Sequence, residues 1–266
     1  MKTLWLLLLA ASGLGLICGG CQTNPVTGEN ELILVSPEQE KQMGRDTAAQ
    51  VEKELGQSVK DQQLQNYINS IGQGIARISH TPDEGFSYKA IDHKSVNAFA
   101  LPGGYIYITT GLLKELNSEA QLASVLAHET AHVTARHIAQ QITRDILIDT
   151  GLSVVGSQAT SSAMRVANIV RQLESMSFTR EQEKQADEVG MDYLVKAGFT
   201  PYGMIETMEI LQRQSGSRTI EFFSTHPNPE NRIGYLQERI YSKGYRGEGK
   251  TGQSEYRTNV LSRLGK

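Results

Sequence analysis

The sequence lacks a dominant charge and any long run of charges of one sign. Its 26 basic and 29 acidic residues leave a formal net charge of −3. A nucleic-acid-binding surface is normally basic, so this balance argues against such a partner. The missing runs also argue against steering of ligands by gross charge. The chain has no internal repeat, and with 39% hydrophobic residues it has ordinary globular composition.

Cysteine is scarce, and the two present, Cys18 and Cys21, both close the N-terminal stretch MKTLWLLLLAASGLGLICGGC. One lysine, an apolar run from Leu4 to Ile17 and several small residues form the layout of a secretory signal peptide. The run is shorter than the roughly 20 residues that cross a bilayer. We therefore expect residues 1–20 to be a signal peptide of the lipoprotein type and not a transmembrane anchor.

The end of this stretch is more specific. Gly19 and Gly20 before Cys21 resemble a bacterial lipobox, in which the cysteine is lipidated and becomes the first mature residue. Cys18 stands where the lipobox usually has leucine, and a C-x-x-C redox or metal pair is the alternative. Gln22 resembles the residue found in lipoproteins sorted to the outer membrane. We expect a lipid-anchored protein on the periplasmic side of the envelope, at the outer membrane rather than the inner.

Periodicity and capping signals predict a mainly helical α+β chain with one domain over residues 36–242. Residues 21–35 are expected to be a tether, and Ser36, Pro37 and Gln39 to begin a helix. FSYKAIDH and VNAFALPGGYIYITT predict three strands, the last two joined by a Pro-Gly-Gly turn. Further helices are expected at about 61–78, 118–140, 143–174, 179–196, 201–214 and 229–242, with a polar, irregular tail over 243–266.

The stretch LASVLAHETAHVTARHIA contains an H-E-x-x-H pattern, with His128 and His132 on either side of Glu129. Positions four apart on an α-helix lie about 40° from each other, so the two imidazoles project from one face. That geometry suits one zinc ion, and Glu129 is placed to act as general base on a water. A helix with two unrelated histidines is the alternative, because the pattern is short. A third ligand is needed.

His137 is not expected to be that ligand. On an uninterrupted helix it lies about 140° from His132 and about 180° from His128, on the opposite side. The extended H-E-x-x-H-x-x-G-x-x-H pattern also fails, because Ala135 and Ile138 replace its glycine and third histidine. We expect His137 to be a surface or packing histidine.

A better candidate lies in SFTREQEKQADEVG. Glu183 and Asp187 are four residues apart and share one face of the predicted helix. The first carboxylate would bind zinc and complete a His2Glu site. The second, one turn later on the helix, would hydrogen-bond one of the zinc-binding histidines. The alternative is a solvated acidic face with salt bridges between positions four apart.

HETAH, SFTREQEKQADEVG and STHPNPENRI, with NAFALPGGYIYITTGLL upstream, resemble the motifs of the HtpX/Oma/CAAX-endopeptidase family of zinc metallopeptidases. The resemblance covers roughly residues 24–239. Within the family, the chain looks like the small periplasmic lipoprotein members. It implies a mainly helical zincin-like domain with a small β-sheet beside the active-site helix. It also implies one Zn²⁺ per chain and the following roles: His128, His132 and Glu183 as ligands, Glu129 as catalytic base, and Asp187 as the orienting carboxylate behind a ligand.

The resemblance also draws attention to His226 in the His-Pro motif. In related periplasmic members this histidine approaches the zinc, where it either stabilises the oxyanion or occupies the open coordination position in a latent state. From the sequence alone, His226 before Pro227 is a turn histidine. Arg232 is expected to contact the same region.

Three protein ligands leave one coordination position open, which is the mark of a catalytic site. We expect a zinc metalloendopeptidase that cleaves unfolded or misassembled envelope proteins in protein quality control, with envelope assembly machinery as a partner. A binding strand for extended substrates by β-augmentation is expected at Asn97, Ala98, Phe99 and Ala100, with an ordinary core strand as the alternative. Residues 151–162 form either a lid or a plain connector.

Two other functions stay open at this point. One is a latent or chaperone-like periplasmic module whose zinc site is largely structural, and the other is a helical scaffold without metal. Glu129 favours the peptidase, because a purely structural site does not need that carboxylate.

Overall fold

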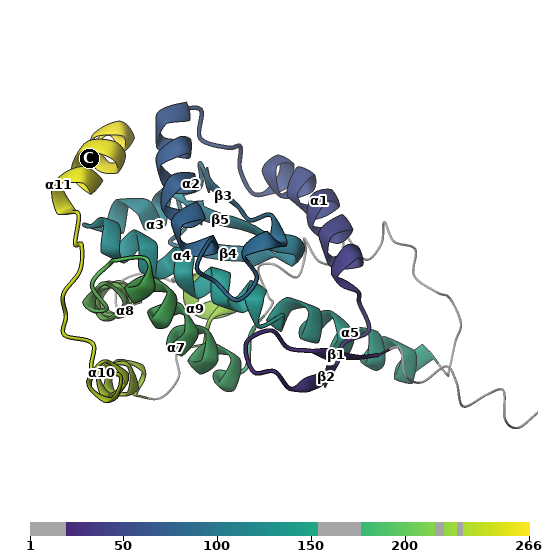
Figure 1. Ribbon diagram of the computed structural model, residues 1–266. Helices are drawn as coiled ribbons and strands as arrows, with labels where there is room; N and C mark the ends of the chain where they lie inside the picture. The colour runs from purple at the N-terminus through teal and green to yellow at the C-terminus, as the bar shows by residue number, and fades with distance from the viewer. Residues whose placement is uncertain (1–19, 154–176, 216–220, 228–230) are drawn as a thin grey trace, which may run out of the picture.

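A small sheet lies at the centre of the molecule, surrounded by helices (Figure 1). The computed structural model describes residues 20–153, 177–215, 221–227 and 231–266. The sheet contains β3 (Ser87–Ile91), β5 (Tyr105–Thr109) and β4 (Ala98–Leu101), in that order. The β3 strand is parallel to β5, whereas β4 is antiparallel to it. The α+β class and the three strands are as the sequence predicted.

The turn between β4 and β5 is a single 3-10 turn over Pro102–Gly104. Gly103 has φ 71° and Gly104 has φ 87°, a left-handed conformation that glycine adopts without the strain of a side chain. This turn brings β4 back beside β5 and leaves β4 at the edge of the sheet.

Two helices precede the sheet. The first, α1 (Pro37–Glu54), begins with a capping box, since Ser36 and Gln39 each bond the other's backbone N–H. The second, α2 (Gln62–Ala76), is capped by Asp61 and packs a buried apolar stripe against the sheet. Gly72 permits this contact, because a Cβ there would lie 2.2 Å from the ring of Tyr88. The start of α1 that the capping signals predicted is correct.

The core of the molecule is α4 (Glu119–Thr134), which follows the short α3 (Thr110–Glu115) and is buried along its whole length. A helix buried on every side must be covered by several elements. These are the sheet, α2, α7 (Arg180–Lys196) and α8 (Tyr202–Ser215). The α7 helix approaches closely at Gly190, where a Cβ would lie 3.1 Å from the backbone of His128. The short α9 (Phe222–Thr225) and α10 (Arg232–Ser242) complete this side.

The helix predicted over residues 118–140 is interrupted. The α4 helix ends at Thr134, and α5 (His137–Ser153) starts in a new direction. Arg136, between them, has φ 56°, a conformation that non-glycine residues seldom adopt. The sequence carries no glycine or proline here, so nothing local marked the kink.

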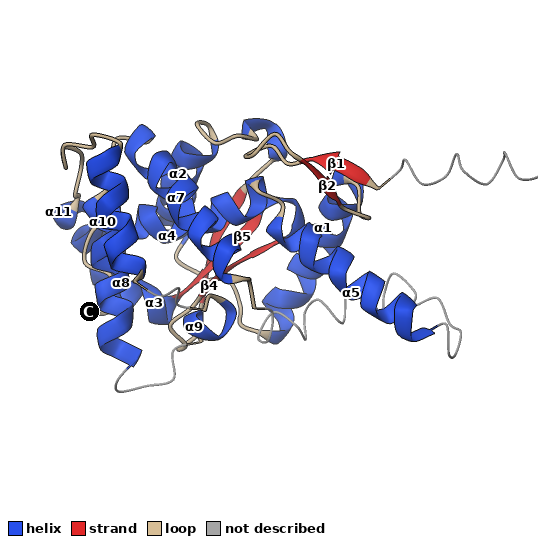
Figure 2. Cartoon of the chain, turned by 90° about the horizontal axis from the view of Figure 1, so that it is seen from below, coloured by secondary structure: helices blue, strands red, loops and turns tan. Residues whose placement is uncertain are grey.

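Residues 21–35 were expected to be a tether, but they pack on the domain. The strands β1 (Cys21–Thr23) and β2 (Asn30–Leu32) form an antiparallel hairpin. Asn24 donates from its side chain to the carbonyl of Ala135 at 3.1 Å. Figures 1 and 2 both place this hairpin beside α5, at the end of the molecule opposite α8 and α10.

Residues 243–266 were expected to be an irregular tail. Residues 243–252 contain no helix, as expected, but the residues after them form helical turns. These are α11 (Gln253–Tyr256) and two further turns over Arg257–Leu261 and Ser262–Leu264. The buried Tyr256 donates to the carbonyl of Leu113 at 2.7 Å, which ties the segment to α3.

Within the described ranges, none of the helices combines the length and apolar character needed to span a bilayer. The predicted signal peptide and residues 154–162 of the predicted lid lie outside the described residues, apart from Gly20 at the end of the former.

Candidate metal centre

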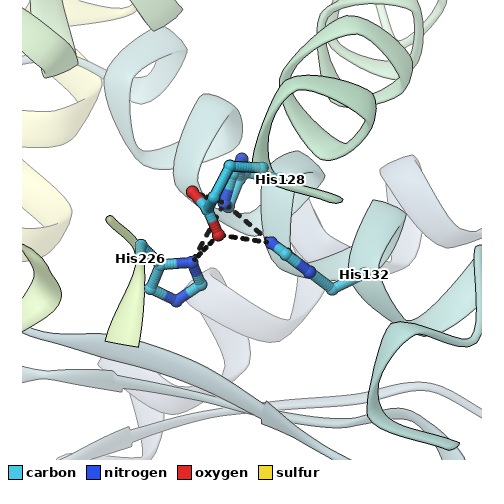
Figure 3. A group of neighbouring side chains, drawn as sticks. His128, His132 and His226 are labelled. Carbon is cyan, nitrogen blue, oxygen red and sulfur yellow. Dashed lines mark hydrogen bonds and ion pairs between the residues drawn. The ribbon is translucent and has the colours of Figure 1, made fainter. Parts of the chain in front are cut away.

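Four buried side chains from three parts of the chain converge at one point. His128 and His132 come from α4, Glu183 from the first turn of α7, and His226 from the residue that follows α9. One donor atom from each lies within 4.8 Å of all the others. Figure 3 shows the three labelled histidines pointing toward one another around a carboxylate.

The spacing of these donors suits a tetrahedral zinc ion. With metal–ligand bonds of 2.0–2.1 Å, neighbouring donors of a tetrahedron lie about 3.4 Å apart. The Nε2 atoms of His128 and His132 are 3.0 Å apart, and His132 Nε2 is 3.3 Å from Glu183 Oε1. His226 Nδ1 is 3.3 Å from His128 Nε2 and 2.9 Å from Glu183 Oε1. The residues therefore fit a metal ion.

Glu183 is held as an anion. Burial raises the pKa of its carboxyl, but the rings of His226 and His132 outweigh burial and hold the pKa well below its usual range. Arg232 Nη1 adds a positive charge 3.4 Å from Glu183 Oε2. An ionised carboxylate among two or three histidines is a typical ligand set for zinc.

A charged network supports His128 from behind. Its Nδ1 lies 3.0 Å from Asp187 Oδ1, which also accepts a 2.6 Å hydrogen bond from Arg232. Tyr235 donates its hydroxyl proton to the other oxygen of Asp187. Burial raises the pKa of Asp187, but Arg232 and His128 bring it below its usual value. Asp187 is thus placed as the anion that orients His128.

A different network supports His132. Its Nδ1 lies 3.0 Å from Nδ1 of His137, and Nε2 of His137 lies 2.6 Å from Oε1 of Gln185. Burial lowers the pKa of His137 to about 4, so this network is neutral at physiological pH. The expectation that His137 points away from the site is wrong, because the kink at Arg136 turns its side chain back.

Buried contacts hold the kink itself. Arg136 Nε donates to Glu40 at 3.0 Å, and its Nη2 donates to the carbonyl of Val35 at 3.0 Å. Its Nη1 donates to Gln22 in the hairpin at 2.6 Å. The segment before α1 and the first turns of α1 therefore stabilise a left-handed residue that would otherwise be strained.

Glu129 lies beside the metal ligands and is fully buried. Neither of its carboxylate oxygens has a hydrogen-bond partner among the described residues, and Oε1 is 3.5 Å from Nε2 of His226. Burial raises the pKa of Glu129 against the lowering effect of His226 and His128. Unpartnered buried polar atoms are rare in folded proteins. A carboxylate in this state suits a group that exchanges protons with a water or substrate.

Backbone hydrogen bonds of α9, just before His226, hold this residue in the site. The N–H of Phe222 donates to Val96 just before β4, and Thr225 accepts from the N–H of Phe178. Phe222 stacks on His226 with ring centroids 4.5 Å apart, and Phe178 stacks on His132 at 3.9 Å. Burial lowers the pKa of His226, but Glu183 and Glu129 more than offset it, so the pKa is raised.

The predicted binding strand is the edge strand of the sheet. Ala98, Phe99 and Ala100 lie on β4, and Asn97 precedes it. The N–H of Thr109 donates to the carbonyl of Asn97 at 3.0 Å. Hydrogen-bonded and non-hydrogen-bonded pairs alternate in antiparallel strands, so the N–H and C=O groups of Ala98 and Ala100 point away from β5.

Comparison with known proteins agrees with this geometry. Residues 62–240 match the sequence profile of peptidase family M48. The chain belongs to peptidase family M48. The match contains α4, α7 and α9 and therefore every residue of the metal centre. The family-level resemblance of the motifs is thereby confirmed.

Curated relatives from bacteria and eukaryotes share this region. The beta-barrel assembly-enhancing protease of Escherichia coli (strain K12) is 31% identical over 255 residues, covering 90% of this chain and 52% of the relative. Metalloendopeptidase OMA1, mitochondrial, of Danio rerio is 29% identical over 240 residues, covering 82% and 50%. The mitochondrial metalloendopeptidase OMA1 of Schizosaccharomyces pombe is 29% identical over 227 residues, covering 80% and 65%. The chain spans about half the length of the first two.

Proposed function

We propose that this chain is a zinc-dependent endopeptidase. The observation that carries the proposal is the cluster of four buried donors at zinc-like spacing, with an unpartnered Glu129 carboxylate beside it. The names of the relatives, which are proteases and metalloendopeptidases, favour the same reaction over a chaperone-like module with a structural zinc site.

The residues divide the chemistry as follows. His128, His132 and Glu183 would hold the ion, which when bound polarises the scissile carbonyl and lowers the pKa of a water. Glu129 accepts a proton on a carboxylate oxygen and later delivers it to the leaving nitrogen. Its raised pKa suits this task, because the carboxyl must hold the proton between the two steps.

His226 accounts for the fourth donor of the cluster. Its Nδ1 lies 3.3 Å from His128 Nε2 and 2.9 Å from Glu183 Oε1, the spacing expected between two ligands of one ion. The ring therefore fills the fourth coordination position, which an open catalytic site keeps free. We infer that this arrangement is a latent state, and that His226 moves aside when substrate binds. The 3.5 Å approach of its Nε2 to Glu129 supports this inference, because the ring stands between the base and the cluster.

An extended polypeptide is the proposed substrate. Ala98 is fully buried and Ala100 is only 7% exposed, so β4 would offer its outward N–H and C=O groups to an added strand only once the covering side chains move aside. Such binding reads mainly backbone, so sequence specificity would be loose. Unfolded or misassembled envelope proteins fit this better than one defined peptide, and the name of the Escherichia coli relative makes envelope assembly machinery a candidate partner.

Attachment to the envelope is proposed through Cys21. This residue begins β1, is exposed, and follows an apolar N-terminal segment. A lipid on Cys21 would hold the hairpin, and with it the domain, close to a membrane on the periplasmic side, with the outer membrane favoured by Gln22. Labelling of cells with a tagged fatty acid tests this: the wild type is expected to incorporate label and Cys21→Ala is not. Equal labelling would contradict lipidation at this residue.

One experiment tests the enzymatic proposal. We expect the purified full chain to bind one zinc per chain and to cleave casein, and Glu129→Gln to bind zinc but to lose cleavage by roughly 10²–10⁴-fold. Absence of bound zinc, or equal cleavage by both proteins, would contradict the proposal. His226→Ala is expected to keep zinc and to cleave faster than the wild type if the ring blocks the site. Slower cleavage would assign His226 a direct catalytic role.

A further inference from the structure

His132 can bind a metal ion only through an unprotonated Nε2, because that is the ring nitrogen that faces the other donors. A neutral imidazole carries one proton, which must then sit on Nδ1. The environment of Nδ1 therefore decides whether His132 is ready to bind. Histidines that bind metals usually donate this proton to a carboxylate or a carbonyl. Here the atom at 3.0 Å is instead a nitrogen of a second histidine, His137.

The protons along this chain of contacts can be assigned from geometry. Two ring nitrogens 3.0 Å apart share one proton, so one donates and the other accepts. If His132 Nδ1 donates, His137 Nδ1 is the acceptor and the proton of His137 must sit on its Nε2. That Nε2 lies 2.6 Å from the side-chain oxygen of Gln185, which accepts hydrogen bonds and has no proton to give. The assignment is therefore consistent from Gln185 to the metal side of His132.

We propose that His137 and Gln185 are positioning residues, which fix the ring of His132 and keep its proton on Nδ1. The proposal rests on the proposed zinc site and extends it beyond the atoms that contact the ion. It assigns His137 a role that its position on an ideal helix excluded. It also assigns a role to Gln185, which lies between Glu183 and Asp187 in the sequence.

The kink at Arg136 makes this contact attainable. On a continuous helix, residues five apart point about 140° away from each other. Because Arg136 adopts φ 56° and α5 begins at His137, the ring of His137 instead meets that of His132 edge-on, with centroids 5.0 Å apart. Gln185 reaches the same point from α7, the helix that supplies Glu183.

A purely structural role for His137 is the competing explanation, since the residue is buried. Packing alone would not set the tautomer of His132, so the tautomer separates the two explanations. Long-range ¹H–¹⁵N spectra of the metal-free, histidine-labelled full chain report which ring nitrogen carries the proton. We expect the Nδ1–H form of His132 in the wild type. In His137→Ala we expect this preference to be lost.

Zinc affinity provides the second readout. Loss of an outer hydrogen-bond partner typically weakens metal binding by about 10–100-fold. We expect His137→Ala to fall in this range by chelator competition, and His137→Gln, whose side-chain oxygen can accept from His132, to recover most of the loss. Gln185→Leu should weaken binding severalfold. Gln185→Glu keeps an acceptor but adds a buried anion, so it should weaken binding less than Gln185→Leu does.

His93→Ala is the matched control. His93 is half-buried and contacts Ser95, away from the cluster, so its loss should leave zinc affinity and the His132 tautomer unchanged. Wild-type affinity in His137→Ala together with an unchanged His132 tautomer would overturn the proposal. If His137→Ala does not fold, the two Gln185 variants decide: equal affinity in both would overturn it. Failure of the proposed zinc site can be told apart from failure of this proposal. The wild type would then bind no zinc, while the spectra would still report the tautomer of His132.

Discussion

His128 and His132 lie one turn apart on the same helix and present their Nε2 atoms 3.0 Å from each other, yet they are supported in opposite ways. Behind His128 stand an anion and a cation, Asp187 and Arg232. Behind His132 stand two neutral side chains, His137 and Gln185. The difference limits the buried charge: a second carboxylate here would add an anion beside Glu183, which is costly without a further cation.

The two supports also differ in how the fold delivers them. Asp187 lies on the same face of α7 as Glu183, so one regular helix places both. His137 depends on a left-handed residue that is held by contacts with Glu40, Val35 and Gln22. The charged support is therefore built into local geometry, whereas the neutral one depends on distant segments.

Removal of the charged support should have the largest effect. Asp187→Ala would remove the carboxylate that lies 3.0 Å from His128 Nδ1 and would leave Arg232 with only Glu183 as a counter-charge. We expect a loss of about 100-fold in zinc affinity and a fall of about 3–5 kcal/mol in the free energy of unfolding. Chelator competition and urea unfolding measure the two. Asp187→Asn keeps an acceptor and should lie between. A smaller affinity loss than in His137→Ala would reverse the ranking of the supports.

Release of the kink should have the next largest effect. Arg136→Ala would remove the bonds from the Arg136 side chain to Glu40, Val35 and Gln22 and would leave Glu40 without its cation. We expect a loss of about 3 kcal/mol in stability and of about tenfold in zinc affinity, because His137 would no longer be held against His132. Arg45→Ala, on the exposed side of α1, is the control. Reduced stability with unchanged affinity would show that the kink is not needed for the contact.

A smaller effect is expected from the loss of Tyr235, which also supports Asp187. Tyr235→Phe removes one hydroxyl donor to Asp187 and leaves Arg232 in place. One hydrogen bond to a buried anion contributes about 1.5–3 kcal/mol, part of which the remaining donors should recover. We therefore expect a severalfold loss of zinc affinity. Tyr241→Phe, whose side chain is 89% exposed, should change nothing. An effect as large as that of Asp187→Ala would mean that the phenol, not the guanidinium, holds the carboxylate.

The smallest effect is expected at Glu40. Burial raises the pKa of Glu40 above its usual value, although Arg136 lowers it. A carboxyl whose pKa is raised by folding contributes stability below its unfolded pKa of about 4.3, and this contribution is lost as the pH rises through the folded value. Glu40→Gln cannot ionise and still offers an acceptor to Arg136, so it should cost at most about 1 kcal/mol at neutral pH. Its stability should also fall less than that of the wild type as pH rises from about 4. Urea unfolding across this pH range checks both expectations. A large loss of stability in Glu40→Gln at neutral pH would contradict the raised pKa of Glu40.

Much of the site was accessible to sequence reasoning because regular helices carry it. The spacing of His128, Glu129 and His132 in one helix, and of Glu183 and Asp187 in another, predicts shared faces, and the structure brings these faces together. Arg232 lies in the region where the resemblance placed it, against the carboxylates of Glu183 and Asp187. His226 joins the cluster, although its own sequence context indicated only a turn.

The neutral support was not accessible in this way. On an unbroken helix His137 would lie on the far side from His128 and His132, and no glycine or proline marks the break. Gln185 lies about 160° around α7 from Glu183 by helical geometry, so periodicity placed it away from the metal. Gln185 joins the site only because its long side chain reaches His137, which the kink has turned toward His132.

The sequence by itself determined the elements with local causes: the capped helices, the Pro-Gly-Gly turn, and the pairs of site residues four positions apart. These follow from spacing and backbone preference, which act over a few residues. The tertiary structure alone decided the left-handed Arg136, the packed hairpin and the turn of His137 toward His132. Their physical reason is a buried guanidinium that finds its partners in segments about 100 residues away, which no local pattern records.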